Sequence, residues 1–502
     1  MPGPGAIHAV AGMANSSINC WPMLCIAGSS ELSQDGLGAF QESWNPQGGA
    51  QMQIKYPEPA CKYTAKIDNA DRIPFFVEQA VRYAINGRPG ASYLEIGGDT
   101  LREMVPAGTY FPPMTPDPPL QEAASSEVKK AMAVLKSAKS PLIIVGKGAA
   151  YAGATEELLK LVEDSGCPFL PTPMGKGCLP DDHELCIAPA RSAALAGADV
   201  VLLVGARLNW ILHFGRPPRY QRGVKFIQID IEAAEIGHSI PAEVGLVGHA
   251  TAVCRQLNEV ADGWKVADNG AEWLAELAEG KAKNQERSAE LANDRTVPMN
   301  YYCPLEIINQ KCPRDTIIIN EGSETMDIGR TVLQNHEPRT RLDAGSFGTM
   351  GVGLGQAIAA CVVHPEKPVV LVIGDSAFGF SGMEFEAVCR YQMPLIVVII
   401  NNNGIGSFNP GEFEAGEGDM PGRLEHPSKS LTPQAHYEEL ATAFGGKGYF
   451  CVTPEELEAA LDESMASRPY KPTIINTMIS LTSLRKKQTA PSLDFKTDFS
   501  RL

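Results

Sequence analysis

Two polar residues stand where apolar segments end, and their chemistry suits a divalent cation. The segment "LVIGDSAFGF" (371–380) stops at a glycine and then presents the carboxyl group of Asp375. Asn402 follows a second apolar segment 27 residues later, within "IINNNG". Strands that are apolar throughout are typical of buried parallel sheets, which place ligands at their carboxyl ends. A carboxylate, an amide oxygen and a nearby main-chain carbonyl there predict a magnesium site that phosphate oxygens complete.

A plainer interpretation exists for each residue alone. Asp375 could cap a helix, and the asparagines could form a turn. Taken singly, each residue favours that interpretation. The spacing and the strand context together favour the metal site, because "SGMEFEAVCRY" (381–391) between them has helical character and would serve as the crossover of a parallel strand pair.

The elements that must position these residues recur along the chain. Short apolar segments ending in Gly, Asp or Asn alternate with amphipathic segments such as 154–166 and 454–467. This alternation predicts an α/β fold built on parallel sheets. The predicted strands lie in 141–148, 200–207, 225–231, 316–322, 369–375, 394–404 and 472–479.

Composition bounds the class of protein. The chain has 502 residues, enough for about three domains. Its net charge of −16 argues against nucleic acid or an anionic membrane as the main partner. No segment has the length and hydropathy of a membrane span, and "MPGPGAIHAV" lacks the features of a secretory signal. The 12 cysteines are scattered without a CxxC pair, which indicates reduced thiols in an intracellular protein.

Two segments break the alternation and indicate where domains meet. The Pro-rich segment 105–123 is typical of a linker on the surface. The charged segment 271–294 is typical of a connecting helix. We therefore expect domain boundaries near residues 112, 265 and 300.

The motif around Asp375 resembles that of a known enzyme family. Gly374-Asp375-Ser376 followed by Asn401-Asn402 is similar to the GDG…NN diphosphate motif of thiamine-diphosphate enzymes, with Ser in place of the second Gly. An ordered set of further segments resembles the branch of 2-hydroxyacyl-CoA lyases and oxalyl-CoA decarboxylases, most closely the lyases. These segments are 12–22, 146–152, 170–177, 205–221, 326–335, 342–355 and 443–450.

The resemblance implies a role for each matching residue. Asp375 and Asn402 would ligate magnesium through their side chains and Gly404 through its carbonyl, so that the metal holds the cofactor diphosphate. Met350 would wedge the cofactor into its bent shape, and the Gly348 carbonyl would accept the pyrimidine amino group. From the sequence alone, however, Met350 fits better as a core residue, and the glycines fit tight helix–sheet packing.

The central domain would bind the nucleotide of coenzyme A (CoA). Lys147, Arg207 and Asp230 each follow a predicted strand at positions that the family uses for the nucleotide, and Arg88 is a further candidate for a phosphate. Basic side chains suit phosphates, and an acid suits ribose hydroxyls. For Lys147 and Arg207 a solvated loop charge is an equal alternative.

The resemblance also implies the domains and the reaction. The enzyme would cleave a 2-hydroxyacyl-CoA to formyl-CoA and an aldehyde one carbon shorter, as in fatty acid α-oxidation, and would act as a homodimer or homotetramer. The expected parts are a truncated pyrimidine-binding domain with its linker (1–112), a CoA-binding domain (113–265), a helical connector (266–300), a diphosphate- and magnesium-binding domain (301–480) and a tail (481–502).

Three features depart from the family. The chain begins at a Gly-rich turn, so we expect that the first part of the pyrimidine-binding domain, with its activating glutamate, is missing, and that residues 1–502 have little lyase activity. The segment 43–56 interrupts the family's pattern, as a misread intron or a surface loop would. Gly406 replaces an aromatic residue and begins an acidic, glycine-rich segment (406–422) typical of a lid.

The cellular location and the function each have more than one interpretation. Ser500-Arg501-Leu502 resembles the C-terminal S-K-L peroxisomal signal, which implies a peroxisomal import receptor as partner; the alternative is a frayed tail. Besides the lyase, oxalyl-CoA decarboxylase and a truncated non-catalytic paralogue or incomplete gene model stay open.

Overall fold

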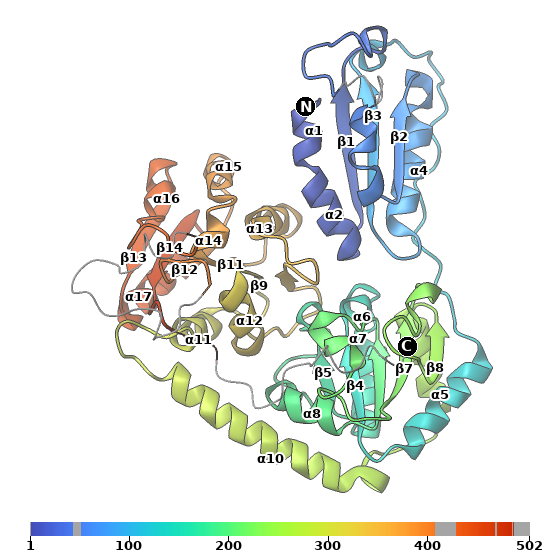
Figure 1. Ribbon diagram of the computed structural model, residues 1–502, viewed down its shortest axis with the longest axis vertical. Helices are drawn as coiled ribbons and strands as arrows, with labels where there is room; N and C mark the ends of the chain where they lie inside the picture. Colours follow the sequence, from blue (N-terminus) through green and yellow to red (C-terminus); the bar gives the residue numbers. More distant parts are fainter. Residues whose placement is uncertain (1, 44–51, 407–427, 467–468, 484, 486–502) are drawn as a thin grey trace. The chain divides into compact units, whose positions relative to one another are not determined.

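The computed structural model describes residues 2–43, 52–406, 428–466, 469–483 and 485, and Figure 1 shows its elements. The chain divides into two compact units, residues 1–120 with 345–349, and residues 121–344 with 350–502. Every strand pair in the described sheets is parallel, and the strands form three sheets. The predicted α/β class with three parallel sheets is therefore confirmed. Among the described residues, no helix is both long and apolar enough to cross a bilayer.

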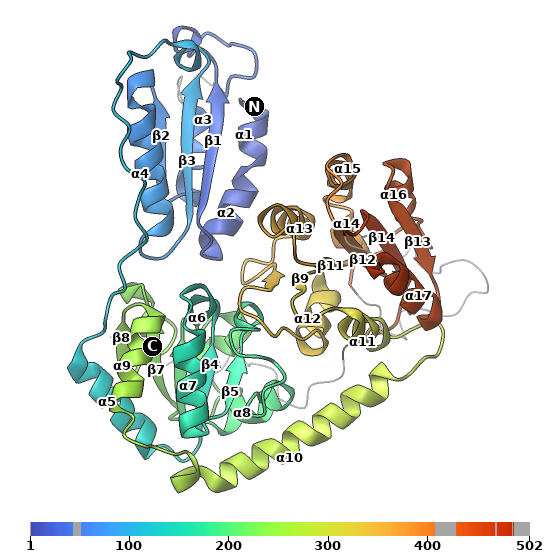
Figure 2. The ribbon, with the colours of Figure 1, turned by 180° about the vertical axis from the view of Figure 1, so that it is seen from behind.

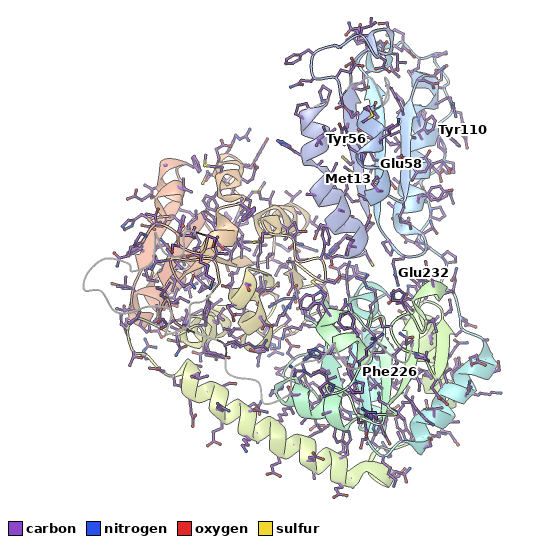
Figure 3. The ribbon with its side chains drawn as sticks, viewed as in Figure 1. Met13, Tyr56, Glu58, Tyr110, Phe226 and Glu232 are labelled. Atoms are coloured by element: carbon purple, nitrogen blue, oxygen red, sulfur yellow. The ribbon has the colours of Figure 1, made fainter. Side chains whose placement is uncertain are left out.

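The first unit contains a sheet with the order β1-β3-β2. Its elements are α1 (Pro4–His8), α2 (Val10–Ile18), β1 (Met23–Ser29), α3 (Met52–Lys55), β2 (Tyr63–Ile67), α4 (Ile73–Ile85) and β3 (Ala91–Gly97). The central strand β3 is buried along its whole length. Tyr93 packs with Met13 of α2 on one face, and Leu94 packs with Ala80 of α4 on the other; Met13 is labelled in Figure 3. Alternating β3 side chains therefore build two small cores.

Part of the interrupting segment 43–56 lies outside the described residues, and part of it is structured. Residues 52–55 form α3, and Gln53 is buried. Its side-chain amide donates to the Gly28 carbonyl at 2.8 Å and to the Tyr93 hydroxyl at 3.1 Å, and its oxygen accepts from the Gly3 N–H at 2.6 Å. This end of the segment therefore joins the N-terminal turn to β1 and β3.

The second unit contains a five-stranded sheet with the order β5-β4-β6-β7-β8. Its elements are α5 (Ser125–Ser137), β4 (Pro141–Val145), α6 (Lys147–Tyr151), α7 (Thr155–Ser165), β5 (Phe169–Pro171), α8 (Arg191–Gly197), β6 (Val200–Val204), β7 (Lys225–Asp230), β8 (Val244–Val247) and α9 (Ala250–Val260). Helix α7 carries one apolar stripe toward the core and ends at Gly166 in the left-handed conformation. Figure 2 shows the same elements from behind.

The second unit also contains a six-stranded sheet with the order β10-β9-β11-β12-β14-β13. Its elements are α11 (Tyr302–Lys311), β9 (Ile317–Glu321), α12 (Ser323–Val332), β10 (Arg341–Asp343), α13 (Val352–Val363), β11 (Val369–Gly374), α14 (Asp375–Phe378), α15 (Phe385–Arg390), β12 (Leu395–Asn401), α16 (Glu439–Ala443), β13 (Lys447–Cys451), α17 (Pro454–Met465) and β14 (Thr473–Met478). The long helix α10 (Ala267–Ala292) precedes them and coincides with the expected connector. The domain boundaries at 112, 265 and 300 stay predictions.

Candidate cofactor and metal site

The carboxyl ends of β11 and β12 bring the predicted metal ligands to one edge of the six-stranded sheet. The two strands are paired in parallel with Gly374 opposite Ile400, and every residue of both strands is buried. Asp375 follows the first strand and Asn402 follows the second. The predicted relationship between the two strands is therefore confirmed, whereas the metal roles stay predictions.

Asp375 is a buried carboxyl group held by backbone donors. Only 2% of the residue is exposed. One oxygen accepts from the Ser376 N–H at 2.7 Å and the other accepts from the Gly404 N–H at 3.0 Å. Burial raises the pKa of Asp375 to about 7 despite these donors, because the low-dielectric surroundings penalise the charged form. A cation at this carboxyl would offset that penalty.

The three asparagines at the end of β12, Asn401 to Asn403, make different contacts. The Asn401 oxygen accepts from the Asn403 N–H at 2.9 Å, and its nitrogen donates to the Asn476 oxygen at 3.1 Å. Asn403 adopts the left-handed conformation, with φ of 62°, which turns the chain. The Asn402 nitrogen donates to the Gly406 carbonyl at 2.9 Å. The Asn402 oxygen is consequently its side-chain atom suited to a cation.

The turn is supported by a buried chain of amides. Asn476 of β14 accepts from Asn401 and donates to the Glu438 carboxylate at 2.8 Å. Asn401, Asn476 and Glu438 are all buried, so each polar group obtains its partner from the next. This chain, Asn401–Asn476–Glu438, fixes the end of β12.

The donor set fits magnesium better than a transition metal. Within the described ranges no three His, Cys, Asp or Glu residues cluster as metal ligands would. Asp375, Asn402 and Gly404 instead offer one carboxylate, one amide and one main-chain carbonyl. Hard oxygen ligands of low total charge suit a magnesium ion that also carries phosphate oxygens.

The remaining residues predicted to hold the cofactor are placed in different units. Gly374 is the N-cap of α14, and Ser376 donates its N–H to Asp375. Met350 lies in the second unit with 38% of the residue exposed, so the alternative of a core residue is not what the structure describes. Gly348 belongs to the first unit and has φ of 68°, a conformation that favours glycine.

A second buried carboxyl group stands beside this edge, and the sequence analysis missed it. Glu321 is the last residue of β9 and pairs with Ile373 of β11. Only 1% of it is exposed, and burial raises its pKa to about 7. Its carboxyl oxygens accept from the backbone N–H groups of Gly351 and Gly353. "TIIINEG" and "VVLVIGD" share one signal, an acid where a buried apolar segment ends.

A further carboxyl group missed by the sequence analysis is buried in the first unit. Glu95 of β3 is 1% exposed, and burial raises its pKa. Its oxygens lie 3.4 Å from the Lys66 amine and 3.3 Å from the Tyr93 hydroxyl, and Lys66 also pairs with Asp35. These contacts describe an ion-pair network inside a small core.

The middle sheet brings three of the four predicted CoA residues to one edge. Strands β4, β6 and β7 are neighbours, and Lys147, Arg207 and Asp230 stand at or just after their carboxyl ends. The turns after β4 and β6 lie so close together that a Cβ on Gly146 would be 2.1 Å from the Gly205 carbonyl oxygen. Glycine is therefore required there for packing.

The acid of this group is oriented by its own turn. One oxygen of Asp230 accepts from the backbone N–H of Glu232 at 2.9 Å, and Glu232, labelled in Figure 3, caps the next short turn. The Lys147 amine lies 4.9 Å from the Tyr151 ring centroid. Arg88 belongs to the first unit, where its carbonyl accepts from the Lys62 amine at 2.6 Å.

Family models match the chain in three places. They are the N-terminal thiamine pyrophosphate (TPP) binding domain at residues 1–51, the thiamine pyrophosphate enzyme central domain at 128–257 and the C-terminal TPP binding domain at 322–477. The N-terminal match means that the expectation of a truncated first domain is only partly supported. The central match covers every strand of the five-stranded sheet, and the C-terminal match covers the six-stranded sheet except β9 and the last residue of β14.

Named relatives align along almost the whole chain. The 2-hydroxyacyl-CoA lyase 1 of Homo sapiens is 48% identical over 494 residues, which are 97% of this chain and 84% of that protein. The 2-hydroxyacyl-CoA lyase of Arabidopsis thaliana is 41% identical, over 95% of this chain and 83% of that protein. The oxalyl-CoA decarboxylase of Escherichia coli K12 is 37% identical, over 97% and 86%. The chain therefore belongs to the thiamine-diphosphate enzymes, in the carbon–carbon lyase branch of the 2-hydroxyacyl-CoA lyases.

Proposed function

We propose that the substrate is a 2-hydroxyacyl-CoA and that the products are formyl-CoA and an aldehyde one carbon shorter, with magnesium as the metal, as in fatty acid α-oxidation. The observation that carries this proposal is the buried carboxyl group of Asp375 at the edge of β11 and β12, in a chain that is 48% identical to a 2-hydroxyacyl-CoA lyase. That edge is where parallel sheets place phosphate-bearing ligands.

The chain's own residues would hold the metal and exclude water from it. Asp375, Asn402 and the Gly404 carbonyl would bind magnesium, which would hold the cofactor diphosphate against the sheet. Thiamine diphosphate, when bound, supplies the carbon nucleophile and accepts the electrons released as the carbon–carbon bond breaks. The almost complete burial of Asp375 and Asn402 would keep bulk water from the metal.

The middle sheet would bind the nucleotide of CoA. Lys147 and Arg207 would contact phosphates and Asp230 would accept ribose hydroxyls, because these side chains share one sheet edge. Arg88 of the first unit is a further candidate for a phosphate. Arg207→Ala and Lys147→Ala should raise the Kd for the acyl-CoA, measured by calorimetry, with little change in the Kd for thiamine diphosphate.

Purified protein tests the proposal by two readouts. Calorimetry should show binding of thiamine diphosphate that depends on magnesium and on Asp375. Mass spectrometry should detect formyl-CoA and the shortened aldehyde from a 2-hydroxyacyl-CoA. Absence of cofactor binding would overturn the proposal. Binding without turnover would agree with the expectation of little lyase activity, whereas turnover comparable to a relative's would contradict that expectation.

Oxalyl-CoA decarboxylase is a second candidate, because the Escherichia coli enzyme aligns with 97% of this chain. Carbon dioxide release from oxalyl-CoA, without aldehyde from a 2-hydroxyacyl-CoA, would favour it. A chain that binds thiamine diphosphate but neither acyl-CoA would favour the non-catalytic paralogue.

We also propose a peroxisomal location and a homo-oligomer. Ser500-Arg501-Leu502 lies outside the described residues, and the proposal rests on its resemblance to the S-K-L signal. A fluorescent protein carrying residues 486–502 should enter peroxisomes, and deletion of the last three residues should leave it in the cytosol. Sedimentation of the purified chain should show a dimer or tetramer.

A further inference from the structure

The carboxyl group of Glu321 joins three elements next to the predicted cofactor site. Glu321 is the last residue of β9, which is separated from β12 by β11. It pairs with Ile373 of β11, and Ile373 lies two residues before Asp375. One of its oxygens accepts from the Gly351 N–H, and the other accepts from the Gly353 N–H at 2.5 Å. The contact therefore spans 30 to 32 residues of sequence and anchors the start of α13 to the sheet.

The fit around this carboxyl group is tight. A Cβ on Gly353 would lie 2.6 Å from the nearer Glu321 oxygen and 2.9 Å from the Leu371 side chain. Gly353 has helical geometry within α13, so its lack of a side chain is required by space rather than by conformation. Gly351, directly before the helix, has φ of 86° and needs glycine for conformation as well.

A buried carboxyl group is a costly way to cap a helix. A Ser, Thr, Asp or Asn at the N-cap would accept from the Gly353 N–H, at the second helical position, without a buried carboxyl group from a distant strand. Here the N-cap is Gly351, which makes no side-chain bond, and the acceptor comes from a distant strand at 1% exposure. Desolvating a carboxyl group opposes folding, so the contact must serve more than helix formation.

Met350 directly precedes the anchored residues. The residue is 38% exposed, so its own packing holds the segment only in part. We infer that Glu321 is a positioning residue for the cofactor: its bonds to Gly351 and Gly353 hold Met350, the residue proposed to bend thiamine diphosphate, at a fixed distance from the edge that carries Asp375. The inference rests on the proposed function and deepens it by naming the residue that holds Met350 in place.

Two variants disturb the contact from opposite sides. Glu321→Gln keeps the shape but replaces one acceptor oxygen by a donor that faces a backbone N–H. Gly353→Ala leaves the carboxyl group intact and displaces it with a methyl group. Gly355→Ala is the matched control, because it lies in the same helix and its Cβ would meet nothing within 4 Å. Alanine favours the helix at both glycine positions, so faster amide exchange or weaker cofactor binding in Gly353→Ala but not in Gly355→Ala reports on the contact.

Hydrogen exchange of the cofactor-free protein is the first measurement. Amides 351 and 353 should exchange about tenfold faster in Glu321→Gln and Gly353→Ala, the change expected when a buried hydrogen bond is lost. Gly355→Ala should match the unmodified chain. Unchanged exchange in both variants would overturn the contact itself.

Cofactor binding is the second measurement. Both variants should bind thiamine diphosphate with magnesium about tenfold more weakly, while the Kd for the acyl-CoA stays constant. A helix cap without a role toward the cofactor would speed exchange but leave the affinity for thiamine diphosphate unchanged, which would overturn the inference. If the unmodified chain binds no thiamine diphosphate, the proposed function fails as well, and the exchange data still report separately on the contact.

Discussion

The carboxyl group of Asp375 accepts a hydrogen bond from the backbone N–H of Gly404 at 3.0 Å, across 29 residues of sequence. The contact closes the turn after β12 onto the end of β11. Two of the three proposed magnesium ligands are thus fixed against each other within one sheet edge. A site that is already assembled loses little entropy when a metal binds.

Replacing Asp375 by Ala should abolish magnesium-dependent binding of thiamine diphosphate. The expected loss is at least about 100-fold, because removing one member of a buried charge pair costs about 3–5 kcal/mol. Calorimetry with and without magnesium measures it. Asp462→Ala, which removes a surface carboxylate paired with Lys311, should bind as the unmodified chain does. Undiminished affinity of Asp375→Ala for thiamine diphosphate with magnesium would contradict the assignment of Asp375 as a metal ligand.

Glu321 should make the stability of the cofactor-free protein depend on pH. Its pKa is about 7 in the folded chain, above the ordinary value of 4.5, so the folded state binds more protons between those values. Its contribution to the free energy of unfolding should therefore be present below about pH 4.5, fall as the pH rises to about 7 and then level off. The total is about 3 kcal/mol. Urea denaturation of Glu321→Gln should lack this component; an identical pH slope in both proteins would contradict the assignment.

Gln53→Ala should destabilise the first unit. The substitution leaves the Gly3 N–H, the Gly28 carbonyl and the Tyr93 hydroxyl without this partner, at about 1–3 kcal/mol for each buried group. Hydrogen exchange should accelerate in β1 and β3 while α17 keeps its protection. Gln34→Ala, at an exposed position of the same unit, is the control. Equal protection in both variants would show that Gln53 does not join these elements.

Gly146→Ala should destabilise the five-stranded sheet. Its Cβ would lie 2.1 Å from the Gly205 carbonyl oxygen, so the turns after β4 and β6 must separate, at about 1–3 kcal/mol or more. The same separation would move Lys147 and Arg207 apart and weaken acyl-CoA binding. Thermal unfolding and substrate titration measure the two effects. Gly12→Ala meets nothing within 4 Å and should leave both unchanged.

Strands that are apolar on both faces could be predicted from the sequence. β4, β6, β7, β9, β11, β12 and β14 were all predicted, because burial on both faces leaves a continuous apolar segment. Asp375 and Asn402 were found through the same signal. Glu321 was not, although its segment ends in the same way, because only its contacts with Gly351 and Gly353 distinguish it from an ordinary strand end.

Three of the missed strands lack that signal for physical reasons. β2 (Tyr63–Ile67) and β13 (Lys447–Cys451) are edge strands and are only partly buried, so polar residues interrupt them. β5 has 3 residues, too few for any periodicity. Gln53 bonds to groups 25 to 50 residues away, and such contacts leave no trace in local spacing.

The amide chain Asn401–Asn476–Glu438 also bears on how this site can change over evolution. Its members lie on different elements and are joined by bonds that span 75 and 38 residues of sequence. Replacing one member by an apolar residue orphans a buried donor or acceptor on the next, whereas replacing both partners of a bond can be nearly neutral. Accepted substitutions at these three positions should therefore come in combinations, and a lineage that departs from one amide should carry a compensating change at its neighbour.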